Sequence, residues 1–157
     1  MKHLLYRGFA ATAALTLGLL MGCATPQGAD YQPQRGQSGK DVIWIPTSPE
    51  LVTRMLNMAK VTSQDIVYDL GAGDGIIAIT AAKQFGARAY GIEYNPQMAL
   101  HAQNNVRAAG VADKVSIRQG DIFVEKFDEA TVVTMYLLPH LNLKLRPTLL
   151  KMKPGTR

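Results

Sequence analysis

The sequence is poor in residues that support redox or metal chemistry. Its 157 residues include one cysteine and three histidines. A lone cysteine directly after an apolar run is better explained by acylation than by redox or metal chemistry, and no cluster of side chains indicates a metal site. Strong charge is also lacking, because Lys and Arg outnumber Asp and Glu by only 17 to 12. Without Lys2 and Arg7 of the N-terminal segment the balance is 15 to 12, a net charge of +3 that makes a nucleic-acid partner unlikely.

Residues 1–22 have the composition of a signal peptide. Basic residues precede the uncharged apolar run 8–21, which is too short for a comfortable transmembrane helix. The tetrapeptide Leu20-Met21-Gly22-Cys23 resembles a bacterial lipobox, which implies cleavage before Cys23 and lipidation of that residue. By the same resemblance, Ala24 implies a lipid anchor in the outer membrane of the cell envelope, facing the periplasm. A simple signal peptide or an uncleaved anchor is the alternative.

A single domain follows the anchor. Residues 24–40 are rich in Gln, Gly and Pro and lack apolar periodicity, so residues 23–40 are interpreted as the lipidated cysteine and a flexible tether. The folded part therefore runs from 41 to 157, which leaves room for one domain.

The most informative segment of the chain is VYDLGAGDG at 67–75. The apolar run 66–70 indicates a buried strand, and an apolar stretch with helical character opens at Ile76. Three alternate glycines lie between them, so we expect the turn to present backbone N–H groups to a ligand. The dinucleotide pattern G-x-G-x-x-G fails, because its third glycine would fall on Ile76. An ordinary strand–helix turn is the alternative interpretation.

The pattern G-x-G-x-G after Asp69 resembles motif I of the Rossmann-like methyltransferases that depend on S-adenosylmethionine (SAM). The resemblance implies that SAM is the cofactor and that this motif binds it. The residues concerned are Asp69, Gly71, Ala72, Gly73, Asp74 and Gly75.

Two further acidic positions fit this family. Glu93 ends the next expected strand, 22 residues after Gly71, where a carboxylate grips a ribose. We place Tyr94, directly after it, in the cofactor site as well. Gly120-Asp121-Ile122 resembles the segment in which the acid meets the adenine amino group and the neighbouring backbone meets the ring. A solvated strand-end glutamate and a turn aspartate are the alternatives.

The order of elements predicts an α/β fold with a Rossmann-like, doubly wound parallel sheet. Expected strands are 66–70, 87–93, 115–119 and 131–138, and expected helices are 49–60, 76–84, 95–109 and 141–152, with Pro147 in the first turn of a short helix. A full methyltransferase sheet has seven strands, so the domain is interpreted as truncated after the fourth strand, whose apolar edge would be exposed. An unusually small domain, or a partner that covers this edge, is the alternative.

The span 41–157 further resembles a bacterial group related to protein-lysine methyltransferases of the ATP synthase c-subunit type. The entry segment IPTSPE at 45–50 and the run 71–93 carry this likeness, although Ile76 stands where the family usually has arginine. Met135–Pro139 lacks the D-P-P-Y or N-P-P-Y pattern, which argues mildly against an adenine or glutamine acceptor. The implied function is methyl transfer to an amine, on a protein (lysine being one candidate) or on a small molecule.

A lysine acceptor must lose its proton before transfer, and Tyr136 and His140, near the end of the fourth strand, are the candidates for catalysis. The alternatives are a packing aromatic and a surface histidine. Trp44 either covers the cofactor or closes the core, and we favour the core.

Two other functions stay open at this point. One is a non-catalytic envelope lipoprotein that binds SAM or a nucleotide through a degenerate methyltransferase fold. The other is a nicotinamide-dependent oxidoreductase, which Ile76 disfavours. A conflict accompanies the first interpretation, because SAM is a cytoplasmic metabolite whereas the signal directs the domain outward.

Overall fold

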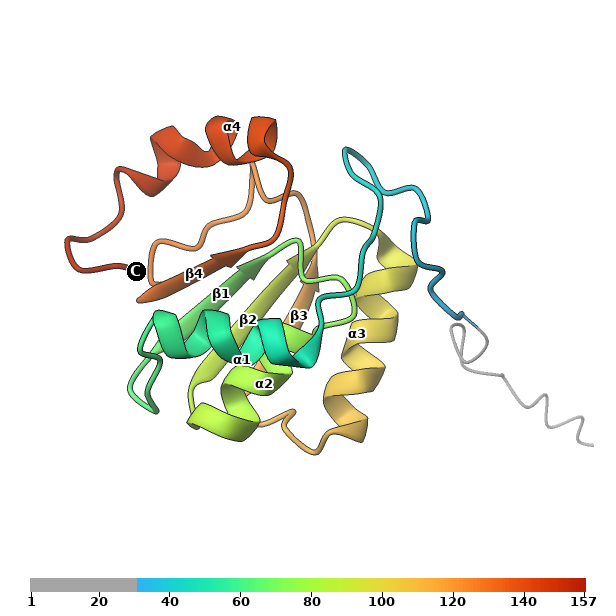
Figure 1. Ribbon diagram of the computed structural model, residues 1–157, viewed down its shortest axis with the longest axis horizontal. Helices are drawn as coiled ribbons and strands as arrows, with labels where there is room; N and C mark the ends of the chain where they lie inside the picture. The colour runs from blue at the N-terminus through green and yellow to red at the C-terminus, as the bar shows by residue number, and fades with distance from the viewer. Residues whose placement is uncertain (1–30) are drawn as a thin grey trace, which may run out of the picture.

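The computed structural model describes residues 31–157 (Figure 1). The signal segment and Cys23 lie outside the described residues, so the lipid anchor and the envelope location stay predictions. Within residues 31–157, no helix is both long enough and apolar enough to cross a membrane.

Within residues 31–157, four helices and four strands follow an N-terminal hairpin, and they alternate except that β4 comes directly after β3. Their bounds are α1 Pro49–Met58, β1 Ile66–Leu70, α2 Ile76–Phe85, β2 Arg88–Glu93, α3 Pro96–Ala108, β3 Val115–Gln119, β4 Val132–Met135 and α4 Pro139–Leu149. The first three strands and helices match the predicted ranges to within two residues.

The strands form one parallel sheet in the order β3-β2-β1-β4. β1 lies in the middle, with Asp69 opposite Gly91 of β2 on one side and opposite Thr134 of β4 on the other. The chain therefore builds outward in one direction through β2 and β3 and then returns to the other side of β1. The carboxyl ends of β1 and β4 meet at this reversal, which is where ligands bind in open parallel sheets.

Helices lie on both sides of the sheet (Figure 1), and apolar residues cover both of its faces. The larger layer joins α1, α2 and α3 to one face, through residues such as Leu56, Ala81 and Val106. The second layer contains Tyr68 and Leu70 of β1 with Leu145 of α4. Helices on both faces of a parallel sheet confirm the predicted doubly wound α/β architecture.

Local signals set the helix boundaries as expected. The Ser48 hydroxyl accepts a hydrogen bond from the Leu51 N–H at 3.3 Å, and the Asn95 side chain accepts from Gln97 and Met98 at 2.9 and 3.1 Å. These are N-cap contacts, each followed by a proline in the first helical turn. Gly86 ends α2 with a φ of 72°, a conformation that glycine adopts without steric cost.

The region around β4 differs from the prediction. The strand covers 132–135 rather than 131–138, because β1 ends at Leu70, the partner of Met135, and offers no backbone beyond it. The predicted open edge of β4 is partly paired, since the Val133 N–H donates to the Arg157 carbonyl and the Arg157 N–H donates to the Thr131 carbonyl.

Pro147 lies inside α4 and not in the first turn of a separate helix, so that prediction was wrong. The helix begins at Pro139, which takes the first-turn position instead. Pro147 and Leu143, four residues before it, are both exposed. Water can therefore reach the Leu143 carbonyl, which lacks a helical N–H partner at Pro147.

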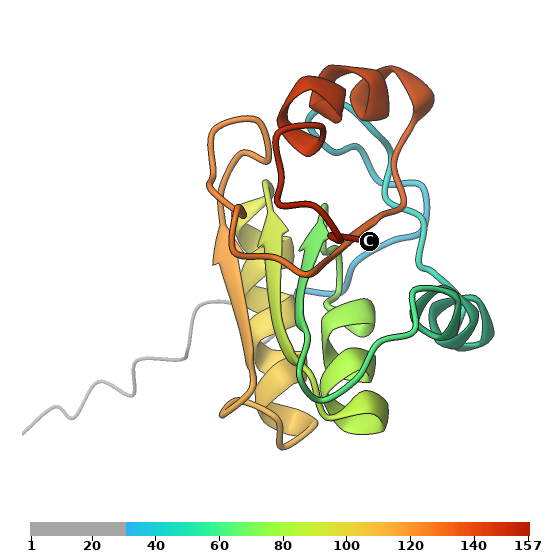
Figure 2. The ribbon, with the colours of Figure 1, turned by 90° about the vertical axis from the view of Figure 1, so that its left-hand side faces the viewer.

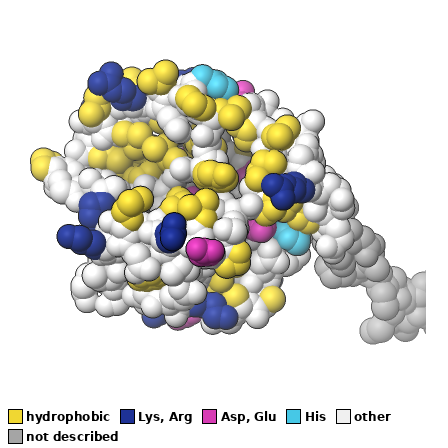
Figure 3. Space-filling model, in the orientation of Figure 1, with side chains coloured by type: hydrophobic (Ala, Val, Ile, Leu, Met, Phe, Trp, Pro, Cys, Tyr) yellow, Lys and Arg dark blue, Asp and Glu magenta, His cyan; other side chains and the backbone are white. Residues whose placement is uncertain are grey.

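An apolar groove lies between β4 and α4 (Figure 3). Its walls include Val133 and Met135 from the strand, and Leu149 and Met152 from the helix and its continuation. Residues 153–157 close the groove at the amino end of β4.

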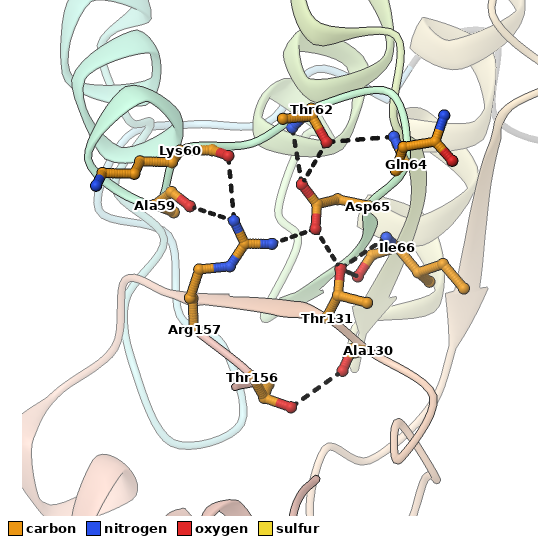
Figure 4. A network of polar contacts seen from close by, with 10 residues as sticks. All are labelled: Ala59, Lys60, Thr62, Gln64, Asp65, Ile66, Ala130, Thr131, Thr156 and Arg157. Atoms are coloured by element: carbon orange, nitrogen blue, oxygen red, sulfur yellow. Dashed lines mark hydrogen bonds and ion pairs between the residues drawn. The ribbon is translucent and has the colours of Figure 1, made fainter. Parts of the chain in front are cut away.

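A polar network ties the end of the chain to the loops below the sheet (Figure 4). Arg157 donates to the carbonyls of Ala59 and Lys60 at 3.0 and 3.1 Å and forms an ion pair with Asp65. Asp65 also accepts hydrogen bonds from Thr131 and from the backbone N–H and hydroxyl of Thr62. One buried carboxylate thus joins the segment between α1 and β1, the residue before β4 and the last residue of the sequence.

The N-terminal hairpin, residues 36–44, precedes α1. The Gly36 N–H donates to the Trp44 carbonyl at 2.8 Å, the Trp44 N–H donates to the Gln37 carbonyl at 2.9 Å, and Ser38 bridges Ile43. Its trace lies beside the carboxyl ends of the strands in Figure 1 and in Figure 2. Residues 36–40, assigned from the sequence to a flexible tether, therefore belong to this hairpin.

Candidate functional site

A pocket opens at the carboxyl ends of β1, β2 and β4. The glycine turn after β1, the end of β2, the loop after β3, the segment after β4 and the N-terminal hairpin all contribute to its wall. The predicted site residues in the wall are Asp69, Gly71, Ala72, Gly73, Asp74, Glu93, Tyr94, Asp121, Ile122 and Tyr136. Gly75 and His140 are the two predicted site residues that do not line it.

The glycine turn has the backbone that its sequence predicts. Gly71, Gly73 and Gly75 have φ values of 84°, 55° and 83°, which side chains rarely allow. A Cβ at Gly71 would lie 2.9 Å from Leu137, and one at Gly73 would lie 2.7 Å from the Trp44 indole nitrogen. Gly75 acts through its backbone, because it caps the N-terminus of α2 in the left-handed conformation.

The turn does not, however, leave its amides free for a ligand as predicted. The N–H groups of Gly71 and Ala72 both donate to the Ile92 carbonyl, at 2.9 and 3.0 Å. The Gly73 N–H donates to Glu93 at 2.9 Å, and the Gly75 N–H donates to the Ala72 carbonyl at 2.9 Å. Buried amides need partners, and β2 supplies them for Gly71, Ala72 and Gly73. The glycines thus allow the positive φ values of the turn, and they let Leu137 and Trp44 approach its backbone closely.

Close packing between the turn and β2 depends on Gly91. A Cβ at this position would lie 2.6 Å from Ile117 and 2.7 Å from Ala72. Such distances force a neighbour to move, and Ala72 belongs to the pocket wall.

We expect Gly91→Ala to lower the free energy of unfolding by about 1–3 kcal/mol and to weaken SAM binding, because overpacking displaces the turn. Urea unfolding and calorimetric titration measure the two effects. Gly110→Ala is the control, since Gly110 has a φ of 69° but no atom within 4 Å of an added Cβ. It should cost stability without changing SAM affinity. Equal SAM affinities for Gly91→Ala and the wild type would contradict the role given to this contact.

Glu93 connects two elements of the site. One carboxylate oxygen accepts from the Gly73 N–H and the other accepts from the Asn95 N–H, both at 2.9 Å. Burial raises the pKa of Glu93, and these hydrogen bonds oppose the rise. A carboxylate has about four acceptor positions, so its oxygens retain lone pairs for two ribose hydroxyls. This geometry fits the predicted role of Glu93.

Asp69 lies at the bottom of the pocket, only 2% exposed. Its carboxylate accepts a hydrogen bond from Thr134 of β4 at 2.8 Å. Burial raises the pKa of Asp69 to about 7, the Thr134 hydrogen bond opposes the rise, and the charges of Asp74 and Glu93 add to it. Burial likewise raises the pKa of Asp74. A pocket with several crowded carboxylates favours a ligand that carries positive charge.

Asp121 lines the pocket from the loop after β3. One of its oxygens accepts from the Phe123 N–H at 2.9 Å, and the other pairs with the Lys40 ammonium at 2.6 Å. Their hydrogen bond raises the pKa of Lys40 and lowers the pKa of Asp121. Tyr94 is close by, with Lys40 4.5 Å from its ring centroid. Ile122 adds an apolar contact surface.

The two candidates for catalysis separate in the structure. Tyr136 follows β4, lines the pocket and is 55% exposed. His140 is exposed in the first turn of α4 and lies outside the pocket wall. Trp44 is half-buried in the pocket wall and is absent from the apolar core clusters, so the interpretation of Trp44 as a core residue was wrong.

The sequence did not predict that residues 37–45 line the pocket. Only Trp44, an isolated aromatic residue before a proline-rich entry segment, gave a signal there. The contact between Lys40 and Asp121 joins positions 81 residues apart, which no local spacing reveals.

The arrangement fits a nucleoside with a cationic tail. Tyr94 and Ile122 offer surfaces for a base, Glu93 offers acceptors for sugar hydroxyls, and the acids around the glycine turn favour a positive group. SAM has all three parts. Among residues 31–157 no three His, Cys, Asp or Glu side chains are grouped so that they could hold a metal ion.

Comparisons with known proteins agree with this site. Residues 69–157 match the ANTKMT methyltransferase domain. A protein from Saccharolobus islandicus named protein-lysine N-methyltransferase is 49% identical over 118 residues, which cover 74% of this chain and 73% of that protein. A ribosomal-protein methyltransferase from Desulfitobacterium hafniense is 39% identical over 83 residues, or 53% of this chain and 26% of that protein.

Solved structures agree as well. An RNA methyltransferase from Salinibacter ruber, in complex with S-adenosyl-L-homocysteine, is 52% identical with a TM-score of 0.70 and covers 71% of this chain and 74% of its own. A methyltransferase from Geobacter sulfurreducens is 24% identical with a TM-score of 0.61, covers 70% of this chain and 46% of its own, and supports the fold alone.

The predicted Rossmann-like fold, enzyme class and cofactor are thereby confirmed. The chain belongs to the ANTKMT methyltransferase domain family and is a SAM-dependent methyltransferase.

Proposed function

We propose that the methyl acceptor is an amine, and that this amine is the side chain of a protein lysine. The observation that carries the proposal is the wall of the pocket after β4, which is formed by Tyr136, Leu137 and Leu141. Among residues 31–157, no carboxylate or amide side chain lies in this part of the wall to bind the edge of a nucleobase. The relative named protein-lysine N-methyltransferase supports the same acceptor.

The residues of the wall suit an amine that must react in its neutral form. Bound SAM supplies an electrophilic methyl group on a sulfonium. Apolar side chains such as Leu137 and Leu141 disfavour the ammonium form, so they lower the pKa of a lysine that enters the pocket. The Tyr136 side chain is exposed at the same place and can orient the amine through its hydroxyl. Alignment of the amine with the methyl group accounts for much of the acceleration.

RNA is the second candidate acceptor, because the Salinibacter ruber structure is named an RNA methyltransferase. The modest net charge of +3 for residues 24–157 favours a protein instead. The two acceptors are distinguished directly by the product that carries the methyl group.

The test is transfer of a labelled methyl group from SAM by the full chain. We expect label in a lysine-rich unstructured polypeptide, little in the same polypeptide after acetylation of its lysines, and little in total RNA. Label in RNA alone would overturn the proposal. SAM binding without label in any acceptor would favour the non-catalytic alternative.

We expect Tyr136→Phe to lower kcat by about tenfold or more, because the hydroxyl that orients the amine is lost. The Kd of SAM should change little, since the aromatic ring stays. His140→Ala is the matched variant outside the pocket and should keep its kcat. A lower kcat for His140→Ala than for Tyr136→Phe would reverse the assignment of the two residues.

A further inference from the structure

The N-terminal hairpin places a cation in the part of the pocket that suits a nucleobase. The Lys40 ammonium lies 2.6 Å from the Asp121 carboxylate and 4.5 Å from the centroid of the Tyr94 ring. Asp121 lies in the loop after β3 and Tyr94 follows β2. Lys40 of the hairpin therefore connects the segments that follow these two strands.

The rest of the hairpin covers the pocket toward the glycine turn. Trp44, at the other end of the hairpin, is so close to Gly73 that an added Cβ there would lie 2.7 Å from its indole nitrogen. Backbone hydrogen bonds join Gly36 to Trp44 and Gly39 to Val42, so the segment holds its own shape. The hairpin thus contacts two separate parts of the pocket wall, at Asp121 and at Gly73.

The contacts of Lys40 are those that a base with an amino group would make. A carboxylate accepts hydrogen bonds from an exocyclic amino group as it does from an ammonium. The face of an exposed aromatic ring can stack with a base, and the same face can attract a cation. The Asp121 oxygen bound to Lys40 and the Tyr94 face beneath it are therefore shared between Lys40 and any base that enters.

We propose that Lys40 competes with the adenine of the cofactor for Asp121 and Tyr94, and that the N-terminal hairpin is a lid that this ion pair holds against the pocket wall. Binding of the base displaces the ammonium from Asp121. Lys40 is thereby a determinant of cofactor affinity that lies outside the family motifs. The inference depends on the cofactor site alone and not on the identity of the methyl acceptor.

The expected change in affinity on removal of Lys40 depends on how exposed the ion pair is. The side chains of Lys40 and Asp121 are 37% and 25% exposed, so water and salt screen the pair. Removing such a competitor is expected to tighten binding by about two- to fivefold.

The test uses adenosine, which has the base and sugar of SAM but no net charge and no methyl group to transfer. We expect calorimetric titration of the full chain at low salt to give a Kd about two- to fivefold lower for Lys40→Met than for the wild type. Raising the salt concentration should tighten adenosine binding to the wild type, because it screens the ion pair, and should affect Lys40→Met little. Lys83→Met, at an exposed position of α2 outside the pocket, should behave as the wild type does.

A double-mutant cycle with Asp121→Asn identifies the partner. Asp121→Asn should weaken adenosine binding, and Lys40→Met added to it should give no further tightening. Unchanged or weaker binding by Lys40→Met, or equal tightening in both backgrounds, would overturn the proposal.

The outcomes separate this proposal from the proposed acceptor. Lack of adenosine binding by the wild type and Lys40→Met alike would overturn the competition, because there would be no base site. Absence of lysine methylation with the expected adenosine results would overturn only the acceptor.

Discussion

Glu93→Gln is expected to weaken SAM binding by tenfold or more. The Glu93 carboxylate accepts from the Gly73 N–H and the Asn95 N–H with different oxygens, and Glu93 lines the pocket. Glutamine has one oxygen and one NH₂ group, so one of the two backbone N–H groups would meet a donor. The ribose hydroxyls would also lose a charged acceptor. A hydrogen bond to a charged group is worth about 1.5–3 kcal/mol, and 1.4 kcal/mol corresponds to a tenfold change in Kd.

Calorimetric titration with SAM measures this change. Glu50→Gln is the control, because Glu50 is an exposed residue of α1 that does not line the pocket, and the substitution should leave the Kd unchanged. An unchanged Kd for Glu93→Gln, with the fold intact by circular dichroism, would remove Glu93 from the cofactor site.

Asp65→Ala is expected to lower the free energy of unfolding by about 3 kcal/mol. The carboxylate of Asp65 is 7% exposed and accepts hydrogen bonds from Thr62, Thr131 and Arg157. Alanine would leave these donors without their acceptor, and breaking a buried ion pair from one side costs about 3–5 kcal/mol. Partial exposure of Arg157 places the expected value at the low end of that range.

The effect of Asp65→Ala should depend on pH. Burial opposes ionisation of Asp65, but hydrogen bonds from Thr131 and Thr62 and the charge of Arg157 outweigh it, so the pKa is lowered from 3.8. A lowered pKa means that the native state favours the ionised form. Its stabilisation is therefore present above pH 3.8 and is lost as the pH falls through the lower, native pKa.

Urea unfolding at neutral and strongly acidic pH tests both statements. The difference between the wild type and Asp65→Ala should be large at pH 7 and should shrink at about pH 2, below the unfolded pKa. Asp113→Ala, at an exposed position, is the control. A difference that stays constant with pH would show that the Asp65 charge does not act as described.

Local sequence signals predicted most of the fold. Ser48-Pro49 and Asn95-Pro96 predicted helix starts because a capping side chain and a proline act within a few residues. The length of β4 was not predictable in this way. Its end depends on where β1 ends, at Leu70, and this partner is about 65 residues earlier in the chain.

The features of the site also fall into two groups, those that local spacing predicts and those that depend on contacts between distant segments. Glu93 and the glycines of the turn are found by their spacing, because a strand, a turn and a helix fix the distance between them. The contact between Lys40 and Asp121, and the position of Trp44 against Gly73, join segments that the sequence does not relate. The pairing of the turn amides with the Ile92 carbonyl likewise appears only when β2 lies beside β1.

The glycine turn is held by the protein itself. Because Ile92, Glu93 and Ala72 accept hydrogen bonds from its amides, its shape does not depend on a bound molecule. The three glycines lose much conformational entropy, and they lose it when the domain folds. SAM therefore meets a turn that is already ordered, and the free energy of its contacts there appears as affinity instead of being consumed in ordering the backbone.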